Sequence, residues 1–308
     1  MNYYKPKELT EAVSLAESAN GSGFFIAGGT DLWVNYLQKN TEPTLLIDLS
    51  EIEELKEINI SKNQIEIGSF VTLDELIRNP LIAKHFPLLA TAGLSIATPV
   101  IRKTATIGGN LLCENRCYYY NQSEFWKNAA GQCLKNCGEI CLATGGAKGC
   151  YSKFVSDMAV ALIAVEGEVE IVEKKVIHKI PIEKIYSGDG IKSKNISPDA
   201  ILKKITLPVE KYTKTYYRKL RSRKSVEFTS LTVAMACDTK NNIRISIGGI
   251  AQKPLLLTGD SSTPVEEFIS SANKQSKIID NDLFPRVYRK EMMGVYIREG
   301  MRGVGVVG

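Results

Sequence analysis

The sequence lacks the apolar segments that mark membrane and secreted proteins. Its 308 residues contain no apolar run approaching the ~18 residues that a membrane-spanning helix needs. The N-terminus MNYYKPKELTEAV has no apolar core of the kind found in signal peptides. These absences predict a cytoplasmic protein without a membrane span.

The common motifs of catalysis and nucleotide binding are also missing. Only two histidines occur, His85 and His178, and neither lies in an H-E-x-x-H pattern. There is no G-x-S-x-G elbow and no P-loop. A Rossmann domain, a P-loop NTPase or a serine hydrolase is therefore not supported, and any nucleotide must be held by another kind of cradle.

Composition and charge are those of an ordinary soluble globular protein. Apolar residues make up 44% of the chain and charged residues 24%, and the net charge is +5. The only dense basic run is 211–224, which fits a solvated strand or a phosphate contact better than a nucleic-acid surface. The length favours two domains.

Hydrophobic periodicity predicts a mixed α and β chain with a change of pattern near residue 207. We expect Thr10 to cap the first helix. Further helices are expected at 31–38, 72–80, 81–97, 156–165, Val265–Gln275 and Leu283–Glu299. Strands are expected at 24–27, 44–49, 200–208, 215–221, 228–239 and 243–251, with hairpins at 58–68 (turn Ser61–Asn63) and 167–182, a turn at Asn241–Asn242 and a strand or extended loop at 101–110. The glycine-rich tail 300–308 is expected to be loose or bound to a partner.

Two glycine pairs, Gly28–Gly29 and Gly108–Gly109, each follow an expected apolar strand. Without a Cβ, the backbone can adopt positive φ and approach a ligand closely, and successive N–H groups then form an anion site. Thr30 and Asp31 would open the next helix, whose N-terminus also favours phosphate. Neither pair forms a G-x-G-x-x-G fingerprint, and the alternative is that both are ordinary turns.

Six of the seven cysteines lie between Cys113 and Cys150. Disulfides are disfavoured in a reducing compartment. Zinc would use paired knuckles, which Cys113/Cys117 and Cys133/Cys137 fit loosely. An iron–sulfur cluster accepts irregular spacing, although the ferredoxin C-x2-C-x2-C run is absent. The seventh, Cys237, is expected to be a small buried residue.

Four segments together resemble the FAD-binding subunit of the xanthine dehydrogenase family of molybdenum hydroxylases: FFIAGGTDLWVN, IGSFVTLDEL, IRKTATIGGNL and VSDMAVALIAV. The resemblance covers most of the chain. It implies an α+β fold with a two-subdomain FAD-binding domain at 1–207, a cysteine-rich cluster insert at about 113–150, and a small C-terminal domain of antiparallel sheet plus helices at 208–308. The flavin would lie in a cleft between the subdomains.

The resemblance also implies a set of FAD contacts. Asp157 would lie near the ribityl chain or ring and Lys219 near the isoalloxazine, unless Lys219 is a solvent-facing strand lysine. The remaining implied contacts are Ile26, Ala27, Gly28, Gly29, Thr30 and Asp31 on the pyrophosphate and adenosine side, and Thr104, Thr106, Gly108, Gly109 and Asn110 on the pyrophosphate and flavin side.

The insert itself resembles the branch of the family represented by the β subunit of 4-hydroxybenzoyl-CoA reductase, through RCYYYNQ, FWKNA, QC, GEIC and GC. That resemblance implies a [4Fe–4S] cluster on Cys117, Cys133, Cys141 and Cys150. Cys113 and Cys137 are then extra, and Cys137 could compete for a ligand place. Tyr118–Tyr120 and Trp126 would shield the cluster, or form only the core of the insert. Lys127, Lys135 and Lys148 would attract an acidic donor, or form only a solvated surface.

The resemblance implies an electron-transfer subunit of a molybdenum-containing complex. Ferredoxin would reduce the cluster, and electrons would pass through FAD to [2Fe–2S] centres on a small subunit and to a molybdopterin-containing large subunit. One alternative reverses the flow, in a dehydrogenase that oxidises a purine, an aldehyde or an N-heterocycle. Another makes the cysteine loop a zinc-stabilised docking module.

Overall fold

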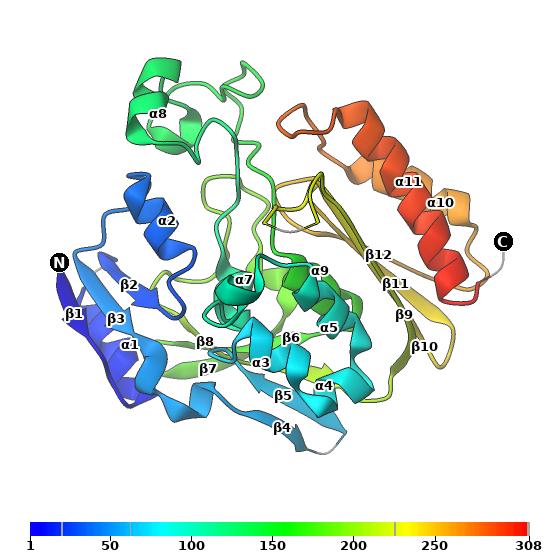
Figure 1. The fold of residues 1–308 in the computed structure, drawn as a ribbon, viewed down its shortest axis with the longest axis horizontal. Coiled ribbons are helices and arrows are strands. Elements are labelled where there is room, and N and C mark those ends of the chain that lie inside the picture. Colours follow the sequence, from blue (N-terminus) through cyan, green and yellow to red (C-terminus); the bar gives the residue numbers. More distant parts are fainter. Residues whose placement is uncertain (20, 62, 225, 307–308) are drawn as a thin grey trace.

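The computed structural model describes residues 1–19, 21–61, 63–224 and 226–306. Lys62 of the predicted hairpin turn and Val307–Gly308 of the tail lie outside the described residues. Within the described ranges the chain forms three β-sheets with helices packed against them (Figure 1). None of the helices in these ranges combines the length and apolar character that crossing a membrane requires.

The N-terminal sheet is small and parallel, in the order β1-β3-β2. Its helix α1 buries Leu9, Ala12, Val13 and Ala16. The prediction that Thr10 caps this helix is wrong, because the helix begins at Leu9 with Glu8 at the cap position. The elements are β1 (Asn2–Tyr4), α1 (Leu9–Ser18), β2 (Gly23–Ile26), α2 (Leu32–Leu37) and β3 (Leu45–Asp48).

The central sheet is antiparallel and has the order β4-β5-β8-β6-β7. The antiparallel pairings β4–β5 and β6–β7 confirm both predicted hairpins. Strand β8 lies between the two hairpins and joins them into one sheet. The elements are β4 (Ile58–Ser61), β5 (Gln64–Gly68), β6 (Glu168–Glu173), β7 (Val176–Pro181) and β8 (Ile201–Pro208).

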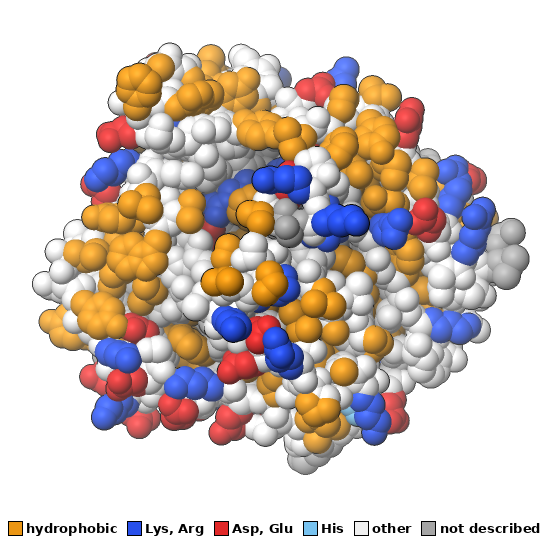
Figure 2. Space-filling view, viewed as in Figure 1, with side chains coloured by type: hydrophobic (Ala, Val, Ile, Leu, Met, Phe, Trp, Pro, Cys, Tyr) orange, Lys and Arg blue, Asp and Glu red, His pale blue; other side chains and the backbone are white. Residues whose placement is uncertain are grey.

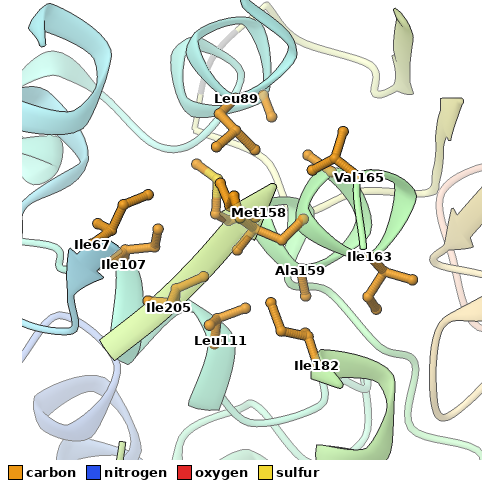
Figure 3. Packing of buried hydrophobic residues seen from close by; sticks show 14 of the residues in the cluster. Ile67, Leu89, Ile107, Leu111, Met158, Ala159, Ile163, Val165, Ile182 and Ile205 are labelled. Carbon is orange, nitrogen blue, oxygen red and sulfur yellow. The ribbon is translucent and has the colours of Figure 1, made fainter. Parts of the chain in front are cut away.

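Helices cover the central sheet, and α9 lies at the middle of the main core. All eight residues of α9 are buried, and Ser156 caps it by accepting from the N–H of Ala159. Figure 3 shows Met158 and Ala159 of this helix packed among side chains from the sheet and from other helices. The covering helices are α3 (Leu73–Arg78), α4 (Pro80–His85), α5 (Pro87–Leu94), α6 (Pro99–Arg102), α7 (Ile107–Leu112) and α9 (Asp157–Ala164).

The strand or extended loop predicted at 101–110 is wrong for most of the segment, because α6 ends at Arg102 and α7 begins at Ile107. Gly108 and Gly109 lie in the first turn of α7, after the cap residue Thr106, and not behind a strand. A Cβ on Gly108 would lie 2.7 Å from the Cβ of Ser69. Close packing therefore requires glycine here, although glycine is a poor helix former.

The C-terminal sheet is antiparallel in the order β12-β11-β10-β9, and two helices pack on one face (Figure 1). Strand β12 was not predicted. The last helix begins later than predicted and continues into the tail that was expected to be loose. The elements are β9 (Tyr212–Leu220), β10 (Leu231–Asp238), β11 (Asn242–Gly248), β12 (Leu255–Asp260), α10 (Val265–Gln275) and α11 (Arg286–Gly303).

The cysteine-rich insert forms a separate lobe beside α2 (Figure 1). It contains helix α8 (Glu124–Ala130), which Ser123 caps by accepting from the N–H of Trp126. The predicted domain boundary near residue 207 stays a prediction. It falls where β8 of the central sheet ends at Pro208, before β9 of the C-terminal sheet begins at Tyr212.

Candidate functional site

A cavity of about 1160 Å³ lies between the N-terminal sheet, α7, the insert and the C-terminal sheet. It is larger than the ~300–1,000 Å³ of most small-molecule pockets, so it suits an extended ligand. All of the predicted cofactor residues except Thr104 line it. Figure 2 shows the molecule in the same view as Figure 1. Hydrophobic side chains gather over α8 and α2 on this face, and Lys and Arg side chains lie across its centre.

The two glycine-containing segments pack against each other at this cavity. A Cβ built on Gly28 would overlap the backbone oxygen of Thr104. Thr104 is therefore the backbone wall behind the first turn and does not itself face the cavity. Since any side chain at position 28 would separate the segments, glycine is required here by packing.

The first turn, Ala27–Asp31, presents free backbone donors. Gly29 has φ of +67°, in the left-handed region that favours glycine. Among the residues that the structure describes, no acceptor faces the N–H groups of Gly28, Gly29 and Thr30. Consecutive free amides of this kind form an anion-binding concavity.

The second glycine pair has a different role in the geometry. Gly108 donates its N–H to the carbonyl of Ser69 (2.9 Å), and Gly109 donates to Oγ1 of Thr106 (3.1 Å). Asn110 Oδ1 accepts from the Ser156 hydroxyl at 2.9 Å. The Gly108 and Gly109 amides already donate hydrogen bonds within the protein. The first turn therefore supplies the free amide donors, and the second glycine pair forms part of the cavity wall.

Asp157 and Lys219 meet at another part of the cavity lining. Their carboxylate and ammonium groups are 2.6 Å apart, and the side chains are 4% and 3% exposed. The alternative that Lys219 is a solvent-facing lysine is therefore wrong. Tyr217 lies on the same strand, and burial raises its pKa well above the usual range.

Asp31 fastens the insert to the first glycine turn. One carboxylate oxygen forms an ion pair with Arg116, and the other accepts from the N–H of Glu114 at 3.2 Å. The Arg116 guanidinium lies over the Phe228 ring, 4.8 Å from its centroid. Sequence analysis missed Arg116, because a single arginine beside a cysteine carries no motif that would distinguish it.

The four predicted cluster ligands face a second, small cavity of about 10 Å³ inside the insert. Burial raises the pKa of the Cys117 thiol to about 11. In the described ranges no three His, Cys, Asp or Glu side chains are arranged to hold a metal ion. The residues that line this cavity are Cys117, Tyr119, Tyr120, Cys133, Leu134, Lys135, Cys141, Leu142, Ala143 and Cys150.

The two extra cysteines lie elsewhere. Cys113 lines the large cavity, and burial raises the pKa of its thiol to about 12. Cys137 is exposed and has φ of 61°. Cys113 and Cys117 both line the large cavity, but Cys133 lines the small one and Cys137 lines neither, so the four cysteines of the predicted zinc pairs do not surround one space. Cys237 is buried in β10, as predicted.

The aromatic and basic residues of the insert differ in their surroundings. Tyr119 and Tyr120 line the small cavity, whereas Tyr118 and Trp126 are 45% and 38% exposed. The buried Lys127 donates to the Gln38 carbonyl at 2.7 Å and to Asn40 Oδ1 at 2.6 Å.

The side chain of Lys135 is also buried, and its ammonium lies 2.9 Å from a Glu114 carboxylate oxygen. Of the three lysines expected to attract a donor, only Lys148 is exposed. Lys127 and Lys135 instead hold the insert in place. Only Lys148 of the three predicted lysines therefore remains on the surface, where an acidic electron donor could contact it.

Comparison with known proteins places this geometry in a family. Residues 1–210 match the model of the FAD binding domain in molybdopterin dehydrogenase. The chain is 29% identical over 263 residues to an aldehyde oxidoreductase FAD-binding subunit of Escherichia coli (strain K12), covering 82% of each chain. It is 23% identical over 261 residues to a xanthine dehydrogenase FAD-binding subunit of Escherichia coli O157:H7, covering 82% of this chain and 75% of that one.

The fold agrees with a solved structure of the same kind. A chain of carbon monoxide dehydrogenase from Oligotropha carboxidovorans superimposes with a TM-score of 0.78 at 22% identity, covering 99% of this chain and 97% of that one. The predicted α+β architecture, with a C-terminal antiparallel sheet and helices, is confirmed.

Proposed function

Because the chain belongs to the family of FAD-binding domains of molybdopterin dehydrogenases, we propose that it is the FAD-carrying electron-transfer subunit of a molybdenum hydroxylase-type complex. The observation that carries this proposal is the large cavity with free amides at Gly28, Gly29 and Thr30. An elongated, anionic dinucleotide fits such a site, because amides would hold its diphosphate and the remaining length would accommodate both ends. When bound, FAD supplies a ring that can take up one or two electrons.

The lining residues have distinct tasks in this proposal. The first glycine turn binds the diphosphate, while the segment around Gly108 and Asn110 forms the wall. Asp157 and Lys219 face the ribityl chain or ring. A fixed cation beside the ring would stabilise negative charge there, and its burial would strengthen that effect.

Flavin analysis of the purified chain tests the proposal. We expect a yellow protein that releases FAD, and not FMN, on denaturation, in a molar amount close to that of the chain. A colourless chain that does not take up added FAD would refute it.

We further propose that Cys117, Cys133, Cys141 and Cys150 hold a [4Fe–4S] cluster. The four thiols share one small cavity, while Cys113 and Cys137 lie outside it. A four-iron cube is wider than a single ion, so its ligands need not converge as closely as those of one metal ion. Iron binding would deprotonate these four thiols, so that cluster loading would be coupled to the folding of the insert.

Metal analysis of anaerobically purified protein distinguishes an iron–sulfur cluster from a zinc site in the insert. Iron and acid-labile sulfide in equal amounts would support the cluster. Zinc without sulfide would instead support the zinc-stabilised docking module.

Two directions of electron flow remain as candidates. The cysteine-lined cavity favours a 4-hydroxybenzoyl-CoA reductase-like complex with ferredoxin as donor. The relatives named an aldehyde oxidoreductase and a xanthine dehydrogenase favour an oxidising complex. In both, the partners would be a molybdopterin-containing large subunit and a [2Fe–2S] small subunit in the cytoplasm. Assaying the purified complex with 4-hydroxybenzoyl-CoA and reduced ferredoxin, and separately with aldehydes and purines, decides between them.

A further inference from the structure

Arg116 is a buried cation with one unused donor group. The residue is 7% exposed, and its backbone exchanges two hydrogen bonds with Lys153 (3.0 and 2.9 Å). Nη2 is paired with Asp31, and the guanidinium carbon lies over the Phe228 ring. In the described part of the chain Nη1 has no hydrogen-bond partner, and the residue lines the large cavity.

An unused donor on a buried guanidinium indicates a missing acceptor. Leaving a buried donor unpaired costs about 1–3 kcal/mol, and more for a charged group, so such groups in folded proteins are normally satisfied by protein, water or ligand. Arg116 lines the large cavity, so a ligand there could supply the acceptor. The ligand atom must be an acceptor, and a cation favours an anionic one.

The position of Arg116 identifies which part of the ligand it meets. Asp31, its ion-pair partner, is the last residue of the turn whose Gly28, Gly29 and Thr30 amides are free. A bare Asp31 carboxylate beside those amides would repel an anion. The Arg116 charge neutralises this carboxylate and adds a donor at the same turn.

We propose that Arg116 donates from Nη1 to the diphosphate of the bound dinucleotide, so that the cysteine-rich insert completes the anion site of the first glycine turn. This inference rests on the proposed FAD-carrying function. The planar fork of arginine can hold Asp31 with one nitrogen and a phosphate oxygen with the other, whereas lysine offers a single point charge. The cation–π contact with the Phe228 ring helps to hold the guanidinium in place.

The test measures equilibrium binding of FAD, and of ADP as a diphosphate without the ring, to flavin-free chain. We expect Arg116→Gln to weaken both FAD and ADP by about 10-fold or more, as loss of a charge-assisted hydrogen bond predicts. Arg116→Lys should weaken both by a smaller factor, because it keeps the charge beside Asp31 but loses the fork. Unchanged affinities in both variants would overturn the proposal. Weaker FAD with unchanged ADP would also overturn it, because Arg116 would then face the ring.

Lys127→Met is the matched control. Lys127 is another buried cation that holds the insert, through Gln38 and Asn40, but it does not line the large cavity. We expect this variant to keep the FAD and ADP affinities of the parent chain. Equal losses in Lys127→Met and Arg116→Gln would show general loosening of the insert and overturn the proposal.

Two further outcomes are separable. If Arg116→Gln does not fold, as judged by circular dichroism, the Arg116→Lys variant decides the matter. If the parent chain itself binds no FAD, the proposed function fails. If the parent binds FAD and the Arg116 variants bind it equally well, only the proposal for Arg116 fails.

Discussion

The Lys219 ammonium lies 2.6 Å from the Asp157 carboxylate, although 62 residues separate the two in the sequence. The pair joins β9 of the C-terminal sheet to the start of α9. The second carboxylate oxygen of Asp157 accepts from the Thr232 hydroxyl at 2.6 Å. Lys219 also donates to the carbonyls of Ser95 (3.2 Å) and Glu227 (3.0 Å). Both buried charges are therefore well hydrogen-bonded, which fixes this side of the cavity.

Replacing Lys219 should destabilise the protein strongly. Lys219→Met leaves the Asp157 carboxylate buried without its cation, and breaking a buried pair in this way costs about 3–5 kcal/mol. Urea unfolding of the flavin-free chain, followed by circular dichroism, measures the change. Lys214→Met, on the exposed side of the same strand, is the control, and we expect it to stay within about 0.5 kcal/mol of the parent. Similar stabilities for both variants would contradict the described pairing.

Side chains introduced at the first glycine turn should abolish FAD binding. Gly28→Ala places a Cβ against the Thr104 backbone, which cannot move aside as a flexible side chain can. Gly29→Val forces a β-branched residue into positive φ and against Trp33. Gly294→Ala on α11 meets only ordinary contacts at 3.5 Å or more and should keep its flavin. The ratio of flavin to protein absorbance reports the result, and full flavin in Gly28→Ala would count against the site.

Local pattern predicts those elements whose burial repeats with a regular period. Strand β6 alternates partly buried and buried residues from Glu168 to Ile171, and α9 has a cap residue followed by an apolar run. The helix α7 was missed because Gly108 and Gly109 have low intrinsic helix propensity. Its formation depends on close packing against Ser69, about forty residues earlier in the chain, and no local window contains that contact.

The polar interactions of the site were less predictable than the backbone turns. The sequence around Lys127 does not distinguish it from a surface lysine. Its hydrogen-bond acceptor Asn40 lies 87 residues away in the sequence, so no local pattern contains this contact. Arg116 and Asp31 likewise meet only because the insert folds back over α2. The glycine turn at Gly28 was recognisable because its chemistry is local, whereas the partner of a charged side chain is decided by the tertiary fold.

The cluster proposal predicts different outcomes for neighbouring cysteines. Cys141→Ser removes a buried thiol from the small cavity and should lose most of the iron, while FAD stays bound. Cys137→Ser changes an exposed thiol outside that cavity, and this variant should keep its iron. Iron and acid-labile sulfide per chain, with the visible flavin spectrum, provide the measurements. Full iron in Cys141→Ser, or its loss in Cys137→Ser, would refute this set of ligands.

The buried carboxylate of Asp282 should make stability depend on pH. It forms an ion pair with Lys153 and accepts from the Ser230 hydroxyl at 2.6 Å. Burial alone would raise the pKa of Asp282, but the Lys153 ammonium and the hydrogen bonds outweigh burial and lower it. A lowered pKa means that the stabilisation is present above the unfolded value of about 3.9 and is lost as the pH falls through the folded value.

The corresponding variant is Asp282→Asn, which leaves the buried Lys153 without a counter-charge. We expect a loss of about 3–5 kcal/mol at neutral pH. The gap between the variant and the parent should narrow as the pH falls below about 4, because the unfolded parent chain then binds a proton at Asp282 that the folded chain takes up only at lower pH. Asp280→Asn, whose side chain is 61% exposed, should differ from the parent by less than about 1 kcal/mol throughout. Urea unfolding of all three chains between neutral and acid pH measures this, and a gap that stays constant would show that the Asp282 charge does not stabilise the fold.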